Sequence, residues 1–163
     1  WVATNTSGKN VDFVRSLGAD EVIDYTKEDF ADRLTNIDIV FDTMGGVTQE
    51  KAFTILKPGG QVISIVGPPT RDFVREVNLP FPFQWGAYVL RLPSLVRAAR
   101  RGAKYQFLFM LPDGSELQQI AGLIEAGKIR PVIDRVYPFA EANLALAHVE
   151  SGRSRGKVVV SIS

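Results

Sequence analysis

The sequence predicts an α/β fold, a doubly wound and mainly parallel sheet covered by helices, and three observations lead to this class. Short apolar segments alternate along the chain with segments whose apolar residues have helical spacing. The segments at 37–42 and 61–67 are almost continuously apolar, as is typical of parallel strands buried on both faces. Several segments end on Asp, Gly or Tyr, where a parallel sheet presents the carboxyl ends of its strands to a ligand.

Strands and helices alternate in the first part of the chain. The expected strands are residues 1–5, 21–25, 37–42 and 61–67, and the expected helices are residues 8–17, 27–34 and 49–56. The first helix has Val11, Val14 and Leu17 along one stripe, and Gly18 follows its last turn. Pro58 and the two glycines after it end the third helix and turn the chain into the next strand. This order predicts parallel pairing of the strands.

The same alternation continues after a proline-rich stretch. The expected helices are residues 84–101, 115–126 and 140–151, and the expected strands are residues 104–110, 131–138 and 156–163. Residues 68–82 are irregular, and we expect them to form a loop over the strand ends, where lids are often found. Pro93 must kink or restart the helix that contains it. In the next helix, Leu117, Ile120 and Ile124 share one face.

Composition and charge exclude several functional classes. With 163 residues, of which 45% are hydrophobic, the chain can bury one core and part of a second. The formal net charge of +1 is too balanced for a nucleic-acid-binding surface, so no nucleic acid partner is expected. The absence of cysteine excludes disulfides and thiolate metal sites, and it is typical of a cytoplasmic protein. We see no signal segment or membrane-spanning apolar run, and therefore expect no membrane insertion.

Several stretches, taken in order, carry a family resemblance. They are VRSLGADEVIDYTKEDF at 14–30, DIVFDTMGG at 38–46, LKPGGQVISIVG at 56–67, AGKIRPVIDRVYPFAEANLALAHVESG at 126–152 and RGKVVV at 155–160. In this order and spacing, the chain resembles the carboxyl-terminal half of a medium-chain dehydrogenase/reductase, closest to the quinone-oxidoreductase-like branch. The LKPGG motif alone also occurs in methyltransferases, whereas the joint order is specific.

The resemblance implies a Rossmann-like sheet over residues 1–128, followed by a return strand, helix and strand over residues 129–163 that would complete the family's catalytic domain. In that family a strand, a glycine-rich phosphate loop and a helix come immediately before the position of Trp1. We therefore expect a truncated piece that lacks the first strand and the glycine-rich loop and is inactive alone. That loop supplies the backbone amides that hold a pyrophosphate, so tight cofactor binding by this piece is not expected.

The residues after the first strand predict which cofactor is bound. A site for NAD usually ends the corresponding family strand with Asp or Glu, which binds the ribose hydroxyls and repels a 2′-phosphate. Here Thr6, Ser7 and Lys9 offer hydroxyls and a cation instead, and the resemblance adds the phenol of Tyr25. The predicted cofactor is therefore NADPH. In the alternative interpretation, Thr6 and Ser7 cap the following helix and Lys9 is a solvated charge.

Further cofactor-binding residues are expected where later strands end. The two glycines after strand 37–42 let a ligand approach the backbone, and Asp42 before them either contacts the cofactor or caps the next helix. The resemblance places Thr43 and Gly45 against the pyrophosphate or the nicotinamide ribose. It also places three residues around the nicotinamide ring: Ile65, Phe107 and Leu108. The alternatives are a plain turn and ordinary core side chains.

The resemblance adds two further expectations. Arg153, Ser154 and Arg155 lie in a turn that returns over the cofactor, where the arginines suit phosphate or carboxamide contacts. An ordinary surface loop explains the same residues equally well. The strand at residues 104–110 is an edge strand in the family and pairs with its twin, so we expect a homodimer.

Neither a catalytic residue nor a metal site is assigned from the sequence. Hydride chemistry belongs to the nicotinamide, so this part of the protein needs no acid–base dyad. A zinc site cannot be built from one histidine and no cysteine. We expect that histidine, His148, to be a half-buried structural residue.

Together these observations predict the NADPH-binding part of a zinc-independent cytoplasmic reductase. It would transfer hydride from NADPH to a quinone, an enone or another activated carbonyl compound of small size. One alternative is a regulatory module that holds NADPH without turnover. A methyltransferase-type domain that binds S-adenosylmethionine is a further alternative, suggested by the LKPGG motif.

Overall fold

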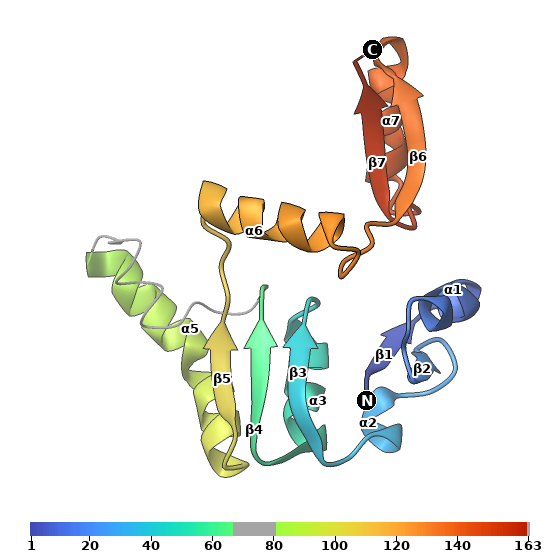
Figure 1. Ribbon diagram of the computed structural model, residues 1–163. Helices are drawn as coiled ribbons and strands as arrows, with labels where there is room; N and C mark the ends of the chain where they lie inside the picture. Colours follow the sequence, from blue (N-terminus) through green and yellow to red (C-terminus); the bar gives the residue numbers. More distant parts are fainter. Residues whose placement is uncertain (67–80, 163) are drawn as a thin grey trace. The chain divides into compact units, whose positions relative to one another are not determined.

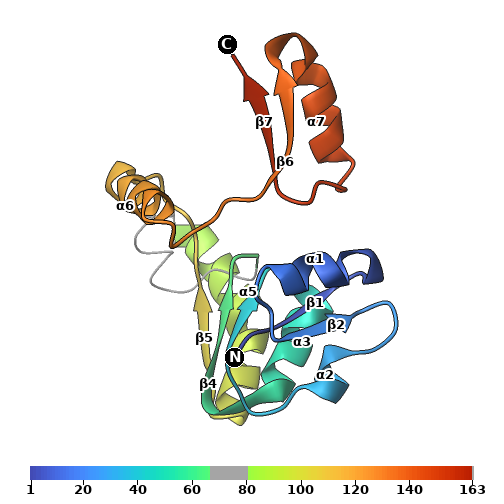
Figure 2. The same ribbon diagram turned by 45° about the vertical axis from the view of Figure 1, so that its right-hand side comes forward.

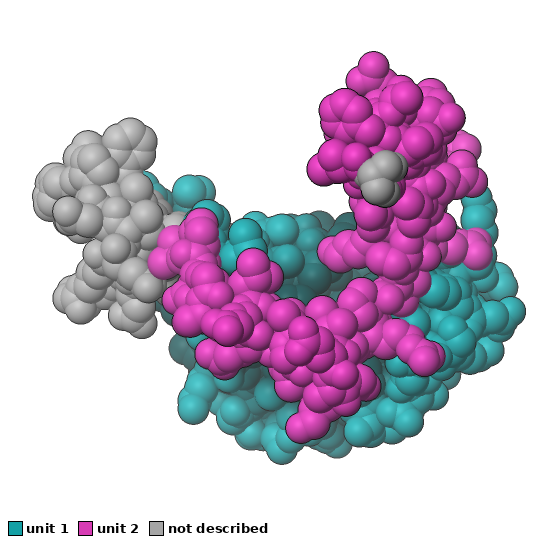
Figure 3. Space-filling model, turned by 45° about the horizontal axis from the view of Figure 1, so that its top comes forward, with its two compact units in different colours: residues 1–110 teal, residues 111–163 magenta. Residues whose placement is uncertain are grey.

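The computed structural model describes residues 1–66 and 81–162. It divides the chain into two compact units, residues 1–110 and 111–163, which Figure 3 shows in teal and magenta. These units are defined by their internal contacts. The division into a domain at 1–128 and a return segment at 129–163 stays a prediction.

Unit 1 is an α/β structure in which strands and helices alternate (Figure 1). Its described strands are β1 (Ala3–Thr6), β2 (Glu21–Asp24), β3 (Ile37–Asp42), β4 (Leu56–Ser64) and β5 (Lys104–Phe107). Its described helices are η1 (Gly8–Asn10), α1 (Val11–Ser16), α2 (Phe30–Arg33), α3 (Gly46–Ile55) and α5 (Phe81–Arg100). The predicted alternation of elements is thus confirmed.

All described strand pairs of unit 1 are parallel, as the predicted α/β class requires. β1 pairs with β2, and β3, β4 and β5 form a second sheet in that order. A register shift in β4 lies at Pro58 to Gly60, where a Cβ on Gly60 would stand 3.0 Å from the carbonyl oxygen of Ile37. The glycine therefore allows the two strands to approach closely.

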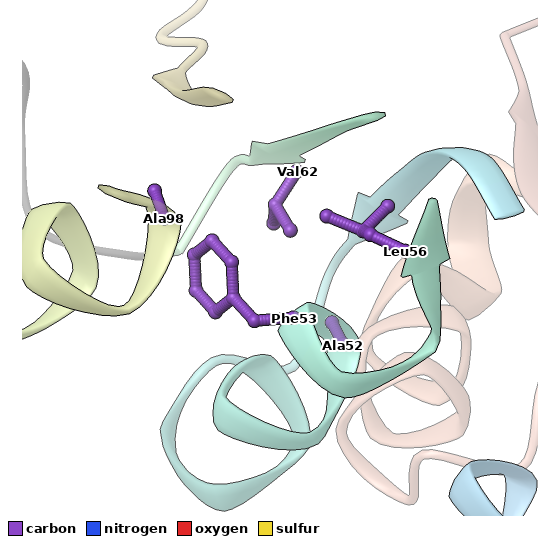
Figure 4. Close-up of a cluster of buried hydrophobic side chains, with 5 residues drawn as sticks. All are labelled: Ala52, Phe53, Leu56, Val62 and Ala98. Carbon is purple, nitrogen blue, oxygen red and sulfur yellow. The ribbon is translucent and has the colours of Figure 1, made fainter. Parts of the chain in front are cut away.

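The core of unit 1 lies between the three-stranded sheet and the helices α3 and α5, which cover one face of it (Figure 1 and Figure 2). Its central buried side chains are those in Figure 4: Ala52, Phe53, Leu56, Val62 and Ala98. Phe53 lies against Tyr105 of β5 with 6.3 Å between ring centroids, so the packing joins α3 to both β4 and β5. Truncation of one such buried aromatic side chain to alanine costs about 3–5 kcal/mol.

Several predicted boundaries and one burial prediction were wrong. β3 is not buried on both faces, because Ile39 and Phe41 are 59% and 58% exposed. The second helix begins at Phe30 rather than 27, since the carboxylate of Asp29 accepts a hydrogen bond from the Ala31 amide and caps it. The helix expected at residues 84–101 begins earlier, at Phe81, and continues through Pro93.

Two further predictions concern the chain on either side of α5. The strand expected at residues 104–110 is shorter, because β5 ends at Phe107. The loop expected at residues 68–82 lies almost wholly outside the described residues.

Unit 2 contains a helix followed by a parallel strand–helix–strand motif. Its elements are α6 (Gly114–Glu125), β6 (Ile133–Pro138), η2 (Phe139–Glu141), α7 (Ala142–Glu150) and β7 (Lys157–Ser161). β6 and β7 are parallel neighbours. His148 of α7 is half-buried, as expected, and its Nε2 lies 2.6 Å from the Asp134 carboxylate of β6. This contact joins the helix to the strand.

Candidate functional site

The carboxyl ends of three neighbouring strands meet at one edge of the larger sheet. Asp42 of β3 is in register with Ser64 of β4, and Ser64 is in register with Phe107 of β5. The chain therefore leaves all three strands at the same level, with Thr43, Ile65 and Leu108 as the next residues. This is the edge at which parallel α/β sheets bind ligands.

Asp42 is the centre of a buried hydrogen-bond network at this edge. Its side chain is only 4% exposed. Oδ1 accepts hydrogen bonds from the backbone amides of Met44 at 3.1 Å and Gly45 at 2.8 Å. Oδ2 accepts from the Gln49 amide at 2.9 Å and from the Ser64 hydroxyl at 2.8 Å. Burial alone would raise the pKa of the Asp42 carboxyl, but these bonds outweigh it and hold the pKa below its usual value.

A second layer of polar groups continues the network away from the sheet edge. The Ser94 hydroxyl of α5 donates to the side-chain oxygen of Gln49 at 3.0 Å, and both residues are buried. The phenol of Tyr105 interacts with Gln49 and Ser64, and its burial raises its pKa. The network thus includes residues of α3, β4, α5 and β5.

The turn after β3 needs glycine at two successive positions. Gly45 and Gly46 have φ values of 69° and 54°, in the left-handed region that other residues rarely adopt. A Cβ on Gly45 would stand 3.3 Å from the Val66 side chain at the end of β4. Thr43 and Met44 are exposed on the same turn. Gly46 is exposed and Gly45 is buried, and the amides of Met44 and Gly45 are held by Asp42.

The ends of β1 and β2 form the second part of the candidate site. Thr6 is in register with Asp24, and the amide of Tyr25 donates to the carbonyl of Thr6 at 3.1 Å. Thr6 and Ser7 are half-buried, and Lys9 and Tyr25 are exposed. The structure therefore brings the predicted phosphate-binding residues to one end of this strand pair.

Sequence reasoning missed Asp24 as a feature of this region. It is 8% exposed, and Oδ1 accepts hydrogen bonds from the Thr26 amide at 3.1 Å and the Thr26 hydroxyl at 2.7 Å. A Cβ on Gly8 would stand 2.6 Å from its Oδ2. Thr26 first, together with Lys27 at 3.4 Å, lowers the pKa of this carboxyl despite its desolvation. An aspartate ending a strand was the signal that could have found it.

The remaining predicted residues fall into two groups. Ile65 is exposed beyond the end of β4, and Leu108 is exposed beyond Phe107, whose ring centroid lies 6.2 Å from that of Phe109. These residues share the strand-end edge with Asp42 and Thr43. Arg153, Ser154 and Arg155 belong to unit 2, in the turn between α7 and β7. Their predicted contact with a cofactor remains a prediction.

A groove within unit 1 runs along β1 and β3, and its lining includes Asp42, Thr43 and Met44.

Among the described residues, no group of three or more His, Cys, Asp or Glu side chains is arranged to hold a metal ion. The helices in the part of the chain that the structure describes include none that is long and apolar enough to cross a bilayer.

Parallel strands whose carboxyl ends share one edge, with a glycine turn at that edge, are typical of Rossmann-like nucleotide-binding α/β domains. A family model described as zinc-binding dehydrogenase matches residues 17–160. The chain therefore belongs to the zinc-binding dehydrogenase family, within the medium-chain dehydrogenases/reductases. This confirms the resemblance inferred from the sequence motifs.

Individual relatives agree with this assignment. The chain is 35% identical to the mitochondrial NAD(P)H oxidoreductase RTN4IP1 of Danio rerio, over 98% of this chain and 42% of the relative. It is 31% identical to the chloroplastic NADPH-dependent alkenal/one oxidoreductase of Arabidopsis thaliana, over 98% of this chain and 33% of the relative. The quinone oxidoreductase structure from Coxiella burnetii superposes with a TM-score of 0.71 at 26% identity, over 99% of this chain and 45% of the other.

The chain spans less than half the length of these relatives. Within that span, the Rossmann-like fold is confirmed, and the curated relatives it matches are named as NAD(P)H or NADPH-dependent oxidoreductases.

Proposed function

We propose that this chain is the NADPH-binding part of an oxidoreductase that transfers hydride to a quinone, an enone or another activated small carbonyl compound. The observation that carries the proposal is the common edge of β3, β4 and β5, with its glycine turn. The names of the relatives, which include an alkenal/one oxidoreductase and a quinone oxidoreductase, support the substrate class. The family match over residues 17–160 favours this function over a methyltransferase.

The described residues fit a bound dinucleotide. The turn at Gly45 and Gly46 presents backbone without side chains, and the exposed Thr43 hydroxyl beside it can bind a ribose or phosphate oxygen. Ile65 offers an exposed apolar surface against which a nicotinamide ring can pack, and Leu108, which follows the neighbouring strand, offers another. When bound, the nicotinamide supplies the hydride, and the protein supplies binding and orientation.

The preference for NADPH is proposed from the ends of β1 and β2. The hydroxyls of Thr6 and Ser7, the ammonium of Lys9 and the phenol of Tyr25 lie at one end of these strands and would hold a 2′-phosphate. The carboxylate of Asp24 is turned toward Thr26 and Lys27.

The test is a fluorescence titration of the full-length protein with NADPH and with NADH. We expect Lys9→Ala to weaken NADPH binding by about tenfold, which corresponds to one charge-assisted contact, and to leave NADH binding unchanged. Lys57→Ala is the matched control, because Lys57 of β4 pairs with Asp38 of β3, away from the carboxyl ends of these strands. Tighter binding of NADH than of NADPH would contradict the cofactor preference.

We also propose a homodimer formed through residues 104–110. Among the described strands, β5 pairs only with β4, so its other edge can accept a second copy. Exposed Phe109 and Met110 follow it. Light scattering should give the mass of a dimer for the full-length protein and that of a monomer for Met110→Lys.

Zinc independence and a cytoplasmic location remain proposals, and some relatives are named as mitochondrial or chloroplastic.

A further inference from the structure

The four hydrogen bonds that the Asp42 carboxylate accepts lead to an inference that rests on the proposed function and deepens it. We propose that Asp42 is a positioning residue. Its carboxylate holds the turn from Thr43 to Gly46 in the shape that receives the cofactor, and it does not contact the cofactor itself. Through Gln49, the same carboxylate ties this turn to Ser94 of α5.

The geometry of the turn supports a positioning role. Oδ1 accepts from two successive backbone amides, those of Met44 and Gly45. The two glycines of the turn have positive φ. Because glycine adopts positive and negative φ about equally readily, these residues do not by themselves hold the turn in one conformation. A fixed acceptor for both amides selects a single conformation, because releasing it would leave the buried Gly45 amide without a partner.

Asp42 belongs to the lining of the groove, but its carboxylate is not available to a ligand. Both of its oxygens are engaged by groups of the chain, and its side chain is 4% exposed. The exposed residues of the turn are Thr43, Met44 and Gly46, and Met44 is 73% exposed. A ligand at this edge therefore meets these three residues, and the influence of Asp42 passes through the backbone that carries them.

The Asp42 carboxylate also joins separate parts of the site. The Ser64 hydroxyl, which donates to Oδ2, also accepts from the Val66 amide at 3.3 Å, so the end of β4 is tied to the same point. Gln49 bridges from Oδ2 to the buried hydroxyl of Ser94. Two hydrogen bonds thus link Ser94 of α5 to the Asp42 carboxylate, and a third links that carboxylate to the Gly45 amide of the turn.

Asp42→Asn and Asp42→Ala distinguish positioning from direct contact. In Asp42→Asn, the amide oxygen can still accept from Met44 and Gly45. Its NH₂ group can donate to Ser64 after the hydroxyl rotates, and to Gln49 after that amide flips. A positioning role is therefore rescued by Asn, whereas a role that needs a negative charge against a ligand is not. Asp42→Ala removes the acceptor altogether.

The experiment uses the full-length protein and two readouts. The first is amide hydrogen exchange at Met44 and Gly45 without nucleotide, and the second is the Kd for NADPH by fluorescence. For Asp42→Ala we expect amide exchange to be faster by about tenfold or more and the Kd for NADPH to rise by about tenfold. A tenfold change in either quantity corresponds to the loss of one hydrogen bond. For Asp42→Asn we expect both to stay within about threefold of wild type.

A milder variant and a matched control complete the design. Ser94→Ala removes only the far end of the network and should raise exchange at Gly45 by a few fold in a folded protein, which keeps the test decisive if Asp42→Ala does not fold. Asp38→Ala, on the same strand but exposed and paired with Lys57, should change neither readout.

The outcomes separate this inference from the proposed function. If Asp42→Asn weakens NADPH binding as much as Asp42→Ala while exchange at the turn is unchanged, the carboxylate is a direct ligand and the inference is wrong. Unchanged exchange in both Asp42→Ala and Ser94→Ala would also overturn it. If the wild-type protein binds no NADPH, the proposed function fails, whereas the exchange measurements still decide whether Asp42 fixes the turn.

Discussion

Two aspartates end parallel strands in unit 1, and the structure uses them differently. Asp42 ends β3 and is bonded by residues of α3 and β4 as well as by its own turn. Asp24 ends β2 and accepts its hydrogen bonds from Thr26, two residues further along, with Lys27 nearby. An aspartate at the end of a strand thus links several elements of the fold in β3, whereas in β2 it stabilises only the turn that follows it.

The largest expected difference between them is in stability. Asp42→Ala leaves two backbone amides and two buried side chains without their acceptor, so we expect a loss of about 3 kcal/mol in the free energy of unfolding. Asp24→Ala should cost clearly less, because the groups that bond it lie beside solvent. Urea unfolding of both variants checks this, and equal losses would remove the distinction.

Replacing a glycine in the turn after β3 tests whether the backbone of this turn requires a left-handed conformation. Gly45→Ala forces a Cβ onto a residue with φ of 69° and against Val66, so we expect a loss of about 1–2 kcal/mol in unfolding free energy. Gly114→Ala is the control, since a Cβ there meets nothing within 4 Å and the residue opens α6. Thermal unfolding that showed no difference between the two variants would contradict the required left-handed conformation.

A matched pair of hydroxyl deletions sharpens the comparison further. Ser64→Ala removes a fully buried hydroxyl from Asp42, and we expect a loss of about 1 kcal/mol. Thr26→Val removes an exposed hydroxyl from Asp24, and its loss should be smaller. Chemical denaturation resolves the order, and a reversed order would show that burial does not set the strength of these bonds.

Protonation of the two aspartate carboxyls is expected to have the smallest effect on stability at neutral pH and a growing effect in acid. The pKa of each carboxyl is lower in the folded protein than its ordinary value of 3.8, so unfolding takes up protons and stability falls as the pH drops below that value. Asp42→Asn should flatten this acid dependence, which urea midpoints between pH 7 and pH 2.5 would measure. An unchanged profile would show that Asp42 titrates normally.

The local parts of this fold could be predicted from the sequence. The bounds of β3 and the glycine turn after it were both recognised, because an apolar β-branched run and two successive glycines are signals carried by neighbouring residues. The fold class followed from the same kind of pattern. Cofactor contacts of Thr43 or Lys9 remain predictions, since no bound ligand tests them.

Other features could not be predicted, because they depend on residues far apart in the chain. Nothing in the sequence links Ser94 to Gln49, or Ser64 to Asp42, yet both pairs are hydrogen-bonded in the fold. The exposure of Ile39 and Phe41 was missed for a related reason. An apolar run shows that a strand can be buried, whereas only the tertiary structure shows which face the helices cover.

The order in which the larger sheet assembles follows from its pairing. β3 and β4 are joined by a single helix, whereas the pairing of Gln61 with Lys104 closes a much longer loop that contains α5. Closing a longer loop costs more chain entropy and slows folding. We therefore expect β3, α3 and β4 to form a nucleus and β5 to dock late, which makes the outer edge of the sheet the last part to become native.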